Sequence, residues 1–502
     1  MKINFRKLSA AYNGRFDFAL VSAILVTAIL VIPRIVPDRS SDRGIFISVA
    51  ARLLSGDVLY SGVYDNKEPL FYYFVTGQLA LGRWSEVAAE FLLIVIAVSA
   101  IFLLATQVAS RWTAAALSFI AAPIILTGEA YYPGYTELPG VALVFAAIAA
   151  SAFGRPILTG AFIGLLLFTK LIFVPIAGLA VCCFSLVNRR HFDFVLYSLG
   201  GLAALALVAV ALFLRGELLP LIETIKLNIS YSQGGLIGAQ KGLATYVAHL
   251  RLIGGRMGWS DRSGSALPTT IIPIMLAITL GLIAISQKPL CRSRIAISAE
   301  SIVTLAVSLL VLSMTGLWVY HRYILYVPTI LGILSLAPLV DLSAGIARSR
   351  TLAIVFLAGF LMAGTLTWKR DFTALRNFRK SYSELNETAP ETQRLLAYGS
   401  GGTYARLGQN DDQGHAVGLG KWKLSCPRFH QYRFESATIL NNVLKCASTA
   451  PVLIIANSIV PEPESNSPTW NDFVAGVEQI AKGYSCDASS GLRICVRPDL
   501  QK

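Results

Sequence analysis

Long apolar stretches separated by short polar segments fill the chain up to residue 367. A helix that crosses a membrane needs about 20 consecutive apolar residues, because the hydrocarbon layer is about 30 Å thick. About eleven stretches approach that length, and several are short by this standard. They lie at 18–35, 91–106, 112–127, 138–153, 157–169, 172–187, 194–214, 270–286, 302–317, 324–340 and 352–367. The pattern predicts an all-α polytopic membrane protein with about eleven transmembrane helices.

The pattern changes after residue 367, where polar residues become frequent. Short runs typical of β-strands alternate there with helical stretches, and Gly or Asn turns separate them. The strand-like runs lie at 395–398, 452–456 and 493–496, and the helical stretches at 437–445 and 472–482. We therefore expect two domains: a membrane module, 1–367, and a small soluble α/β domain, 368–502, which is large enough to hold its own core.

The Lys and Arg residues between the apolar stretches predict the orientation, since short cytoplasmic loops carry an excess of both. The segment 157–187 is long for one helix and short for two. If it crosses twice, with Thr169-Lys170 at the outer turn, the basic loops all fall on one side. That side then holds Lys2, Arg6, Lys7, Arg15, Arg111, Arg155, Arg189, Arg190, Lys288, Arg292, Arg294, Arg348 and Arg350. We expect a multi-pass protein of the cytoplasmic (inner) membrane, with its N-terminus inside and the domain 368–502 outside.

Composition agrees with a membrane protein. The chain is 55% hydrophobic and only 14% charged, whereas soluble proteins carry about 25% charged residues. The net charge of +14 raises the alternative of nucleic-acid binding. We reject it, because many of the basic residues lie in short loops that set orientation, and no basic stripe is interleaved with aromatic residues.

The cysteines are distributed as the predicted orientation requires. Cys182, Cys183 and Cys291 lie in the membrane or inside it. The others lie in the external domain, where disulfides persist; they are Cys426, Cys446, Cys486 and Cys495. Four cysteines allow three pairings. Cys426–Cys446 with Cys486–Cys495 is the simplest, and four free thiols are the alternative.

The first external loop, 36–86, contains a short helical pattern. Apolar pairs repeat about every four residues over 45–54, which makes one apolar helix face that Gly56 ends. The opposite face carries Arg43, Ser48 and Arg52. We expect a helix that lies in the plane of the membrane surface, with Asp42 near its N-cap and the nearby Asp38 and Asp57 solvated.

This loop resembles the first loop of the GT-C class of membrane glycosyltransferases. The residues that carry the resemblance are Asp42 just after the first span, Phe46 four residues on, Ala50 eight on, Gly56-Asp57 at the helix end, and Lys67-Glu68-Pro69-Leu70. The class includes lipid A aminoarabinose transferases, protein mannosyltransferases and the arabinosyl- and mannosyltransferases of actinobacterial envelopes. Its members take a sugar from a polyprenyl-phosphate carrier on the outer membrane face.

The loop departs from the class at two places. The usual acidic pair is Asp42-Arg43 here, and the frequent Lys-Pro-Pro-Leu is Lys67-Glu68-Pro69-Leu70. In the second external loop, 128–137, the class carries an acidic residue, and Glu137 best matches its position. The alternative for Glu137 is a solvated carboxylate in an aromatic belt, because Tyr is common at membrane surfaces.

Basic residues near the outer ends of two spans are candidate phosphate contacts. Lys170 is a charge inside an apolar run, which is costly unless it faces a polar cavity; the alternative is a lysine that extends to the outer surface. His321 and Arg322 start a later span, where they hold a phosphate or simply anchor the helix. The third external loop, 215–267, has no clear structural pattern and is expected to form a flap over the substrate cleft.

The sequence lacks a nucleotide-binding fingerprint and any metal-binding spacing of His or Cys. The resemblance implies transfer of a sugar from a polyprenyl-phosphate carrier to a hydroxyl of an envelope glycan, lipid or protein, with inversion. Asp42 is expected to be the general base, because the hydroxyl must lose a proton. Lys67, Lys170, His321 and Arg322 are the candidate phosphate contacts. Glu137 is expected to orient Asp42 or to share a divalent cation with it.

Three other functions fit part of the pattern. A transporter or lipid flippase is usually built from repeated halves, and no convincing internal repeat is present. A polymerase or ligase of envelope glycolipids also uses a lipid-linked sugar, but would be expected to build its site on a large late loop. A scaffold for envelope assembly is the third alternative.

Overall fold

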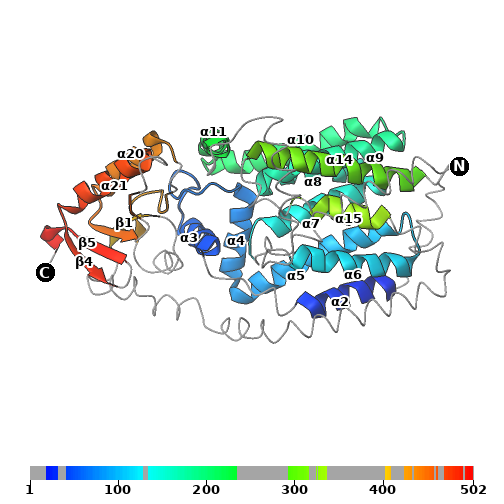
Figure 1. The fold of residues 1–502 in the computed structure, drawn as a ribbon, viewed down its shortest axis with the longest axis horizontal. Helices are drawn as coiled ribbons and strands as arrows, with labels where there is room; N and C mark the ends of the chain where they lie inside the picture. Colours follow the sequence, from blue (N-terminus) through cyan, green and yellow to red (C-terminus); the bar gives the residue numbers. More distant parts are fainter. Residues whose placement is uncertain are drawn as a thin grey trace.

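The computed structural model describes twelve parts of the chain: 18–31, 41–127, 134–234, 292–315, 324, 326–335, 402–408, 423–431, 435–456, 459–461, 468–489 and 492–500. Two regions are visible in Figure 1: a helical body and a smaller C-terminal domain with a β-sheet. Helices α3 and α4 lie where the two regions meet.

The helical body consists of helices that run roughly side by side along the long axis of the molecule (Figure 1). Their bounds are α2 Phe18–Val31, α5 Arg83–Ala105, α6 Arg111–Thr127, α7 Glu137–Ala152, α8 Pro156–Thr169, α9 Val174–Val187, α10 Asp193–Leu214, α14 Arg292–Thr315 and α15 Tyr326–Ser335. Each corresponds to one of the predicted spans. The predicted spans 270–286 and 352–367 lie outside the described residues.

Length and composition identify two helices of the described chain as able to cross a membrane, Trp84–Ala105 and Asp193–Leu214. Shorter apolar helices accompany them, including Glu137–Ala152, Pro156–Thr169 and Leu171–Val187. The helical character of the predicted spans is therefore confirmed where it can be seen. The number of crossings stays a prediction.

The segment 157–187 forms two helices, as the charge pattern predicted. Helix α8 ends at Thr169, and Lys170 has an extended backbone with φ −162° and ψ 85°. A 3-10 turn, η1 (Leu171–Phe173), follows, and α9 begins at Val174 with Pro175 in its first turn. A proline is favourable there because the first turn of a helix needs no N–H from that residue. Lys170 therefore stands at the break between the two helices.

Helices α8 and α10 pack through glycines. A Cβ on Gly160 would lie 1.9 Å from the carbonyl oxygen of Tyr197, and a Cβ on Gly164 would lie 2.7 Å from that of Gly201. Residue numbers increase in the same direction along both helices at these contacts, so α8 and α10 run parallel. Small residues spaced four apart let helix backbones approach closely in this way. This register carries the last turn of α10 past Lys170 and the end of α8.

The predicted helix of the first loop exists, but its polar face is not exposed. Helix α3 spans Ser41–Leu54, and the chain turns at Gly56 with φ +94°. We expected Arg43 and Ser48 on a face away from the apolar core; both are only 1% exposed. That expectation is wrong, because α3 is enclosed between α4 (Pro69–Leu81) and the C-terminal domain (Figure 1). The sequence periodicity shows one apolar face and cannot show that a second surface covers the other.

The C-terminal domain is a five-stranded sheet with two helices. The strands are β1 Thr403–Leu407, β2 Lys423–Leu424, β3 Val452–Ala456, β4 Ser485–Ser489 and β5 Leu492–Val496. Their order is β2-β1-β3-β5-β4; β1 is parallel to β2 and β3, while β5 is antiparallel to β3 and β4. Helices α20 (Ala437–Ala447) and α21 (Pro468–Ala481) complete it, with a final 3-10 turn, η3, at Pro498–Leu500. The predicted α/β class is confirmed; the run 395–398 lies outside the described residues.

Both faces of the sheet are apolar. In β3, Leu453 and Ile455 pack against the domain's own helices, in a core with Trp470. Val452, Ile454 and Ala456 point the other way and join a second core with α3 and α4. Residues of a strand alternate between faces, so a continuous apolar run indicates burial on both sides. The C-terminal domain therefore shares a core with the first loop.

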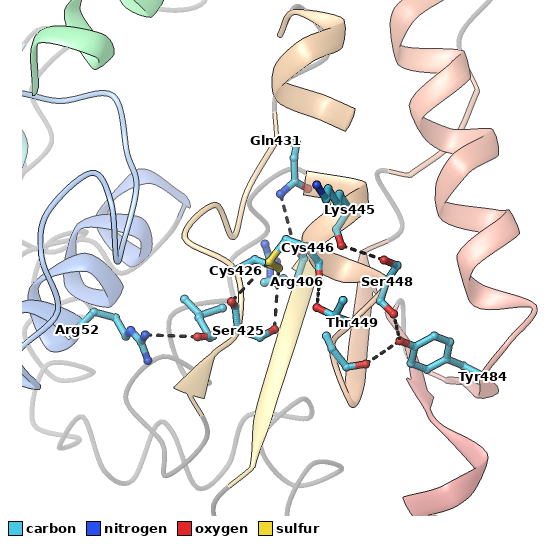
Figure 2. Close-up of a disulfide and its surroundings, with 12 residues drawn as sticks. Arg52, Arg406, Ser425, Cys426, Gln431, Lys445, Cys446, Ser448, Thr449 and Tyr484 are labelled. Carbon is cyan, nitrogen blue, oxygen red and sulfur yellow. Dashed lines mark hydrogen bonds between the residues drawn. A yellow bond between two sulfur atoms is a disulfide. The ribbon is translucent and has the colours of Figure 1, made fainter. Parts of the chain in front are cut away.

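Two disulfides stabilise the C-terminal domain: Cys426–Cys446 and Cys486–Cys495. The simplest of the three pairings is confirmed. Figure 2 shows the first bridge where the 423–431 segment meets α20, with Arg52 of α3 directed toward this segment. The Arg52 guanidinium donates to the carbonyl oxygen of Leu424 at 3.4 Å, which adds a polar contact between α3 and the domain.

The third loop begins with a helix, contrary to the expectation of a segment without structure. Helix α11 spans Leu218–Gly234 and starts directly after a turn at Gly216, where φ is +73°. It lies across the end of the helical body (Figure 1). The predicted flap therefore applies at most to 235–267, which lies outside the described residues.

Candidate functional site

Three of the six predicted site residues, Lys67, Glu137 and Lys170, lie at one end of the helical body. Lys67 lies two residues before α4, Glu137 is the first residue of α7, and Lys170 stands at the break after α8. Asp42 is the second residue of α3, and the position of its side chain is outside the described part of the structure. His321 and Arg322 also lie outside it.

Lys170 and Glu137 form an ion pair. The ammonium of Lys170 lies 3.1 Å from Oε1 of Glu137 and also donates to the hydroxyl of Thr136. Lys170 is 8% exposed, so it does not extend to the surface. Oε2 of Glu137 is buried and has no hydrogen-bond partner among the described residues. The pair is thus a largely enclosed charge cluster with one free acceptor.

A glycine allows the close approach of α7 to the break at Lys170. A Cβ on Gly140, one turn after Glu137, would lie 2.5 Å from the Phe173 ring and 3.1 Å from Cβ of Lys170. Any side chain at this position would push η1 away from α7. Gly140 therefore helps to set the distance at which Lys170 meets Glu137.

The Lys67-Glu68 turn is attached to the same break. Oε1 of Glu68 accepts a hydrogen bond from the backbone N–H of Leu171 at 2.8 Å. The carbonyl oxygen of Lys67 accepts one from the Tyr60 hydroxyl at 2.8 Å. Glu68, the residue that replaces the first proline of the class motif, thus links the first loop to Lys170. Lys67 and Lys170 are brought to the same end of the body by these contacts.

Arg43 connects the first loop to the second. Its guanidinium donates to the carbonyl oxygen of Gly134 at 2.9 Å and lies 2.7 Å from Oε2 of Glu86. It also donates to Gln78 at 3.3 Å. The amide of Gly134 donates to Glu90 at 2.9 Å. The second loop is therefore bound by both backbone polar groups of one residue, Gly134, three residues before Glu137.

Asp65 is a buried carboxylate that the sequence pattern did not single out. It is fully enclosed and lies 3.3 Å from Nε2 of His430 in the C-terminal domain, and it accepts from the Tyr72 hydroxyl. Burial raises the pKa of Asp65, but the His430 contact, the positive charge of Lys67 and the Tyr72 bond outweigh it, so the pKa lies below its usual value. The only sequence signal was its place in the charged turn before α4.

A second overlooked carboxylate, Glu217, lies after α10. It is fully enclosed, accepts from the Tyr73 hydroxyl, and lies 3.2 Å from Nε of Arg215. The backbone N–H of Leu59 also donates to it at 3.2 Å. Burial and the bond to Glu217 raise the pKa of the Tyr73 hydroxyl. Glu217 thus holds the first loop to the end of α10.

Asp57 is not solvated as expected, because it forms an ion pair with Arg52. This pair closes the end of α3. Asp38, which was expected to be solvated as well, lies outside the described residues.

A cavity of about 270 Å³ lies where the first loop, α11 and the C-terminal domain meet. Its polar lining includes Tyr60, Tyr64, Glu223, Thr224, Arg428 and Asn442, and the Cys426–Cys446 bridge forms part of the wall. The wall is held in place by a backbone bond from Tyr64 to Pro427 at 2.8 Å. Because Arg428 is paired with Glu435 at 2.9 Å, the lining offers little net positive charge.

The described residues contain no group of three or more His, Cys, Asp or Glu side chains arranged to hold a metal ion. Glu68 and Glu137 are each engaged by a neighbouring donor. A divalent cation shared by Glu137 and Asp42 stays a prediction.

Comparison with solved structures identifies a protein with a similar fold. No family model matches the chain, and no curated protein matches it in sequence. Among solved structures it is similar to ArnT from Cupriavidus metallidurans bound to undecaprenyl phosphate, with 13% identity over 96% of this chain and 98% of that one, and a TM-score of 0.54.

Two further matches have lower TM-scores. The archaeal oligosaccharyltransferase AglB from Archaeoglobus fulgidus is 12% identical over 93% of this chain and 72% of that one, with a TM-score of 0.47. The mycobacterial arabinofuranosyltransferase AftD is 15% identical over 98% of this chain and 41% of that one, with a TM-score of 0.44. The resemblance to the GT-C class stated from the first loop is confirmed at the level of the fold, by the match to ArnT.

Proposed function

We propose that this protein is a glycosyltransferase that moves a sugar from a polyprenyl-phosphate carrier to an acceptor hydroxyl on the outer face of the cytoplasmic membrane. The observation that carries the proposal is the enclosed Lys170–Glu137 pair beside the Lys67-Glu68 turn. This cluster lies on a fold shared with ArnT, a protein solved with bound undecaprenyl phosphate. The N-terminus is inside and the C-terminal domain outside, as the basic loops and the two disulfides favour.

The donor phosphate lies against Lys67 and Lys170, with His321 and Arg322 as further contacts. Negative charge grows on the phosphate as the sugar leaves, and fixed cations stabilise it best in a site that excludes water. Lys170 suits this role because its ammonium is already held by Thr136 and Glu137 and needs little reorganisation. Glu137 directs the ammonium of Lys170.

Asp42 is the general base. The acceptor oxygen attacks the anomeric carbon as the bond to the phosphate oxygen breaks, with inversion. The hydroxyl proton passes to Asp42, and the bonding electrons leave with the polyprenyl phosphate. Asp42 lies in the first turn of α3, where the helix dipole favours a charged carboxylate.

The acceptor is a neutral, hydroxyl-rich molecule: an envelope glycan, a glycolipid or a glycosylated protein. The cavity beside Glu223 and Asn442 supports this, since carboxylate and amide groups bind hydroxyls and the paired Arg428 leaves little attraction for an anion. In this proposal the C-terminal domain forms one wall of the acceptor site. Tyr60 lines the cavity and bonds to Lys67, which links it to the donor site.

The test is transfer by purified protein in nanodiscs, with polyprenyl-phosphate hexose or pentose labelled in the sugar. Asp42→Asn should lower the rate by about 10²–10⁴, because it removes the base and keeps the shape. Asp193→Asn, at the opposite end of α10, is the matched control and should transfer normally. Normal turnover in Asp42→Asn would remove Asp42 from the mechanism. Failure to transfer from any polyprenyl-phosphate sugar, with ion or lipid movement instead, would favour a transporter.

A further inference from the structure

Arg43 stands where the class carries its second acid, and the structure gives it a different task. We propose that Arg43 is a positioning residue that fixes the Glu137–Lys170 pair relative to α3, the helix that carries Asp42. The inference rests on the proposed function for its effect on turnover, and on geometry alone for its effect on the second loop.

Arg43 reaches three separate elements. Its donors contact Gly134 of the second loop, Glu86 of α5 and Gln78 of α4. Arg43 and Glu86 are each 1% exposed, and Gln78 is 5% exposed. A guanidinium suits such a junction because its donors have a fixed planar geometry. Enclosed to this degree, Arg43 is a contact between elements and is not placed to meet substrate.

The backbone of the second loop is shaped for this contact. Gly134 has φ +82°, and a Cβ there would lie 2.7 Å from Nε of Arg43. Its amide is bound by Glu90 while its carbonyl is bound by Arg43. Only a glycine meets both requirements, because other residues rarely adopt this conformation.

A second contact joins α3 to the second loop. Phe46, one turn after Arg43, packs edge-on against Tyr135 with ring centroids 5.6 Å apart. Thr136 and Glu137 follow at once, and both bind the ammonium of Lys170. A displacement of Gly134 would therefore also displace Lys170, because Tyr135, Thr136 and Glu137 connect the two.

Positioning and stability can be separated at this site. Removing one member of a buried ion pair is strongly destabilising, because the other charge stays buried and unpaired, whereas replacing both by apolar residues is often neutral. Arg43→Met should therefore lower the Tm sharply. The double variant Arg43→Met with Glu86→Leu should regain most of it, without restoring the bond to Gly134.

The experiment measures Tm, transfer kinetics and modification of Lys170 by sulfo-NHS acetate, read by mass spectrometry, in full-length protein in nanodiscs. The exposed Lys445 and Lys482 are internal references. In the double variant we expect Lys170 to react at least 5-fold faster than in the wild type, kcat to stay at least 10-fold low, and the donor KM to change less than 3-fold. Arg43→Lys should recover part of the kcat, since it keeps one donor to Gly134.

The control is the exposed pair Arg493 and Glu478 of the C-terminal domain, 2.6 Å apart. Arg493→Met with Glu478→Leu should leave Lys170 reactivity and kcat unchanged. The inference would be overturned if, in the Arg43 double variant, both the Tm and the rate of Lys170 modification returned to their wild-type values. If the wild type transfers no sugar, the proposed function fails, while Lys170 modification against Tm still decides the role of Arg43.

Discussion

The contact between α8 and α10 and the layer around α3 are both closely packed, but by different means. Between α8 and α10 backbones touch through Gly160 and Gly200, with no side chain between them. Around α3, buried charges make directional contacts; they include Arg43, Glu86, Asp65, His430 and Glu217. Close packing of small residues holds helices together by van der Waals contact. Buried ion pairs contribute little net stability but fix geometry.

The difference indicates where the exact position of side chains matters for sugar transfer. The layer around α3 carries Lys67, Glu137 and Lys170, and charged groups link the elements that hold them. We infer that substitutions in this layer lower the rate of transfer even where the stability is kept, as in the Arg43 double variant. Substitutions in the α8–α10 contact should lower the stability and leave the rate of transfer unchanged.

The largest expected effect is on turnover, from Lys170→Met. Loss of one electrostatic group that stabilises transition-state charge costs about 10²–10³ in kcat. The donor KM should rise less, because the charge develops only as the phosphate leaves. Steady-state transfer in nanodiscs measures both. A kcat within 3-fold of the wild type would move the phosphate site away from Lys170 and toward Lys67, His321 and Arg322.

The next effect is on stability, from Gly160→Leu. The added side chain would begin 1.9 Å from the Tyr197 carbonyl oxygen, so α8 and α10 must separate. Overpacking of this kind costs about 1–3 kcal/mol or more, and the Tm should fall by several degrees. Gly178→Leu in α9 is the matched control, because a Cβ on Gly178 would have no atom within 4 Å.

The kcat of the folded fraction of Gly160→Leu should stay close to the wild type. A large loss of kcat at normal Tm would contradict the division between the two regions.

The smallest expected effect concerns the junction between Asp65 and His430. The pKa of Asp65 is lowered in the folded protein, so its contribution is present above the unfolded pKa of about 3.9 and is lost as the pH falls through the folded value. Asp65→Asn should cost about 1–3 kcal/mol at pH 6, the usual cost of a buried unsatisfied partner. The difference in Tm from the wild type should shrink as the pH is lowered from 5 to 3.

Limited proteolysis over the same pH range tests which part of the protein loses stability. Release of the C-terminal domain, with the helical body intact, is expected. If the difference in Tm between Asp65→Asn and the wild type stayed constant across this range, protonation of Asp65 would not weaken its contact with His430.

Much of the fold could be predicted from local pattern. The break at Lys170 was predicted because a charge interrupts an apolar run and the basic loops require an even number of crossings. The strand Val452–Ala456 was predicted from a run of apolar residues bounded by turns. Lys170 and Glu137 were both selected from the sequence, and the structure brings them into contact.

The sequence by itself determined the helical and α/β regions, the helix of the first loop and its end at Gly56, because these depend on residues close together in the chain. The tertiary structure alone decided that Arg43 is buried, that Asp65 meets His430, and that Glu217 holds the first loop. Arg43 and Gly134 are 91 residues apart, and Glu217 and Tyr73 are 144 apart. A charged side chain looks solvated in sequence, since periodicity records one apolar face and carries no information about a distant segment that covers the other.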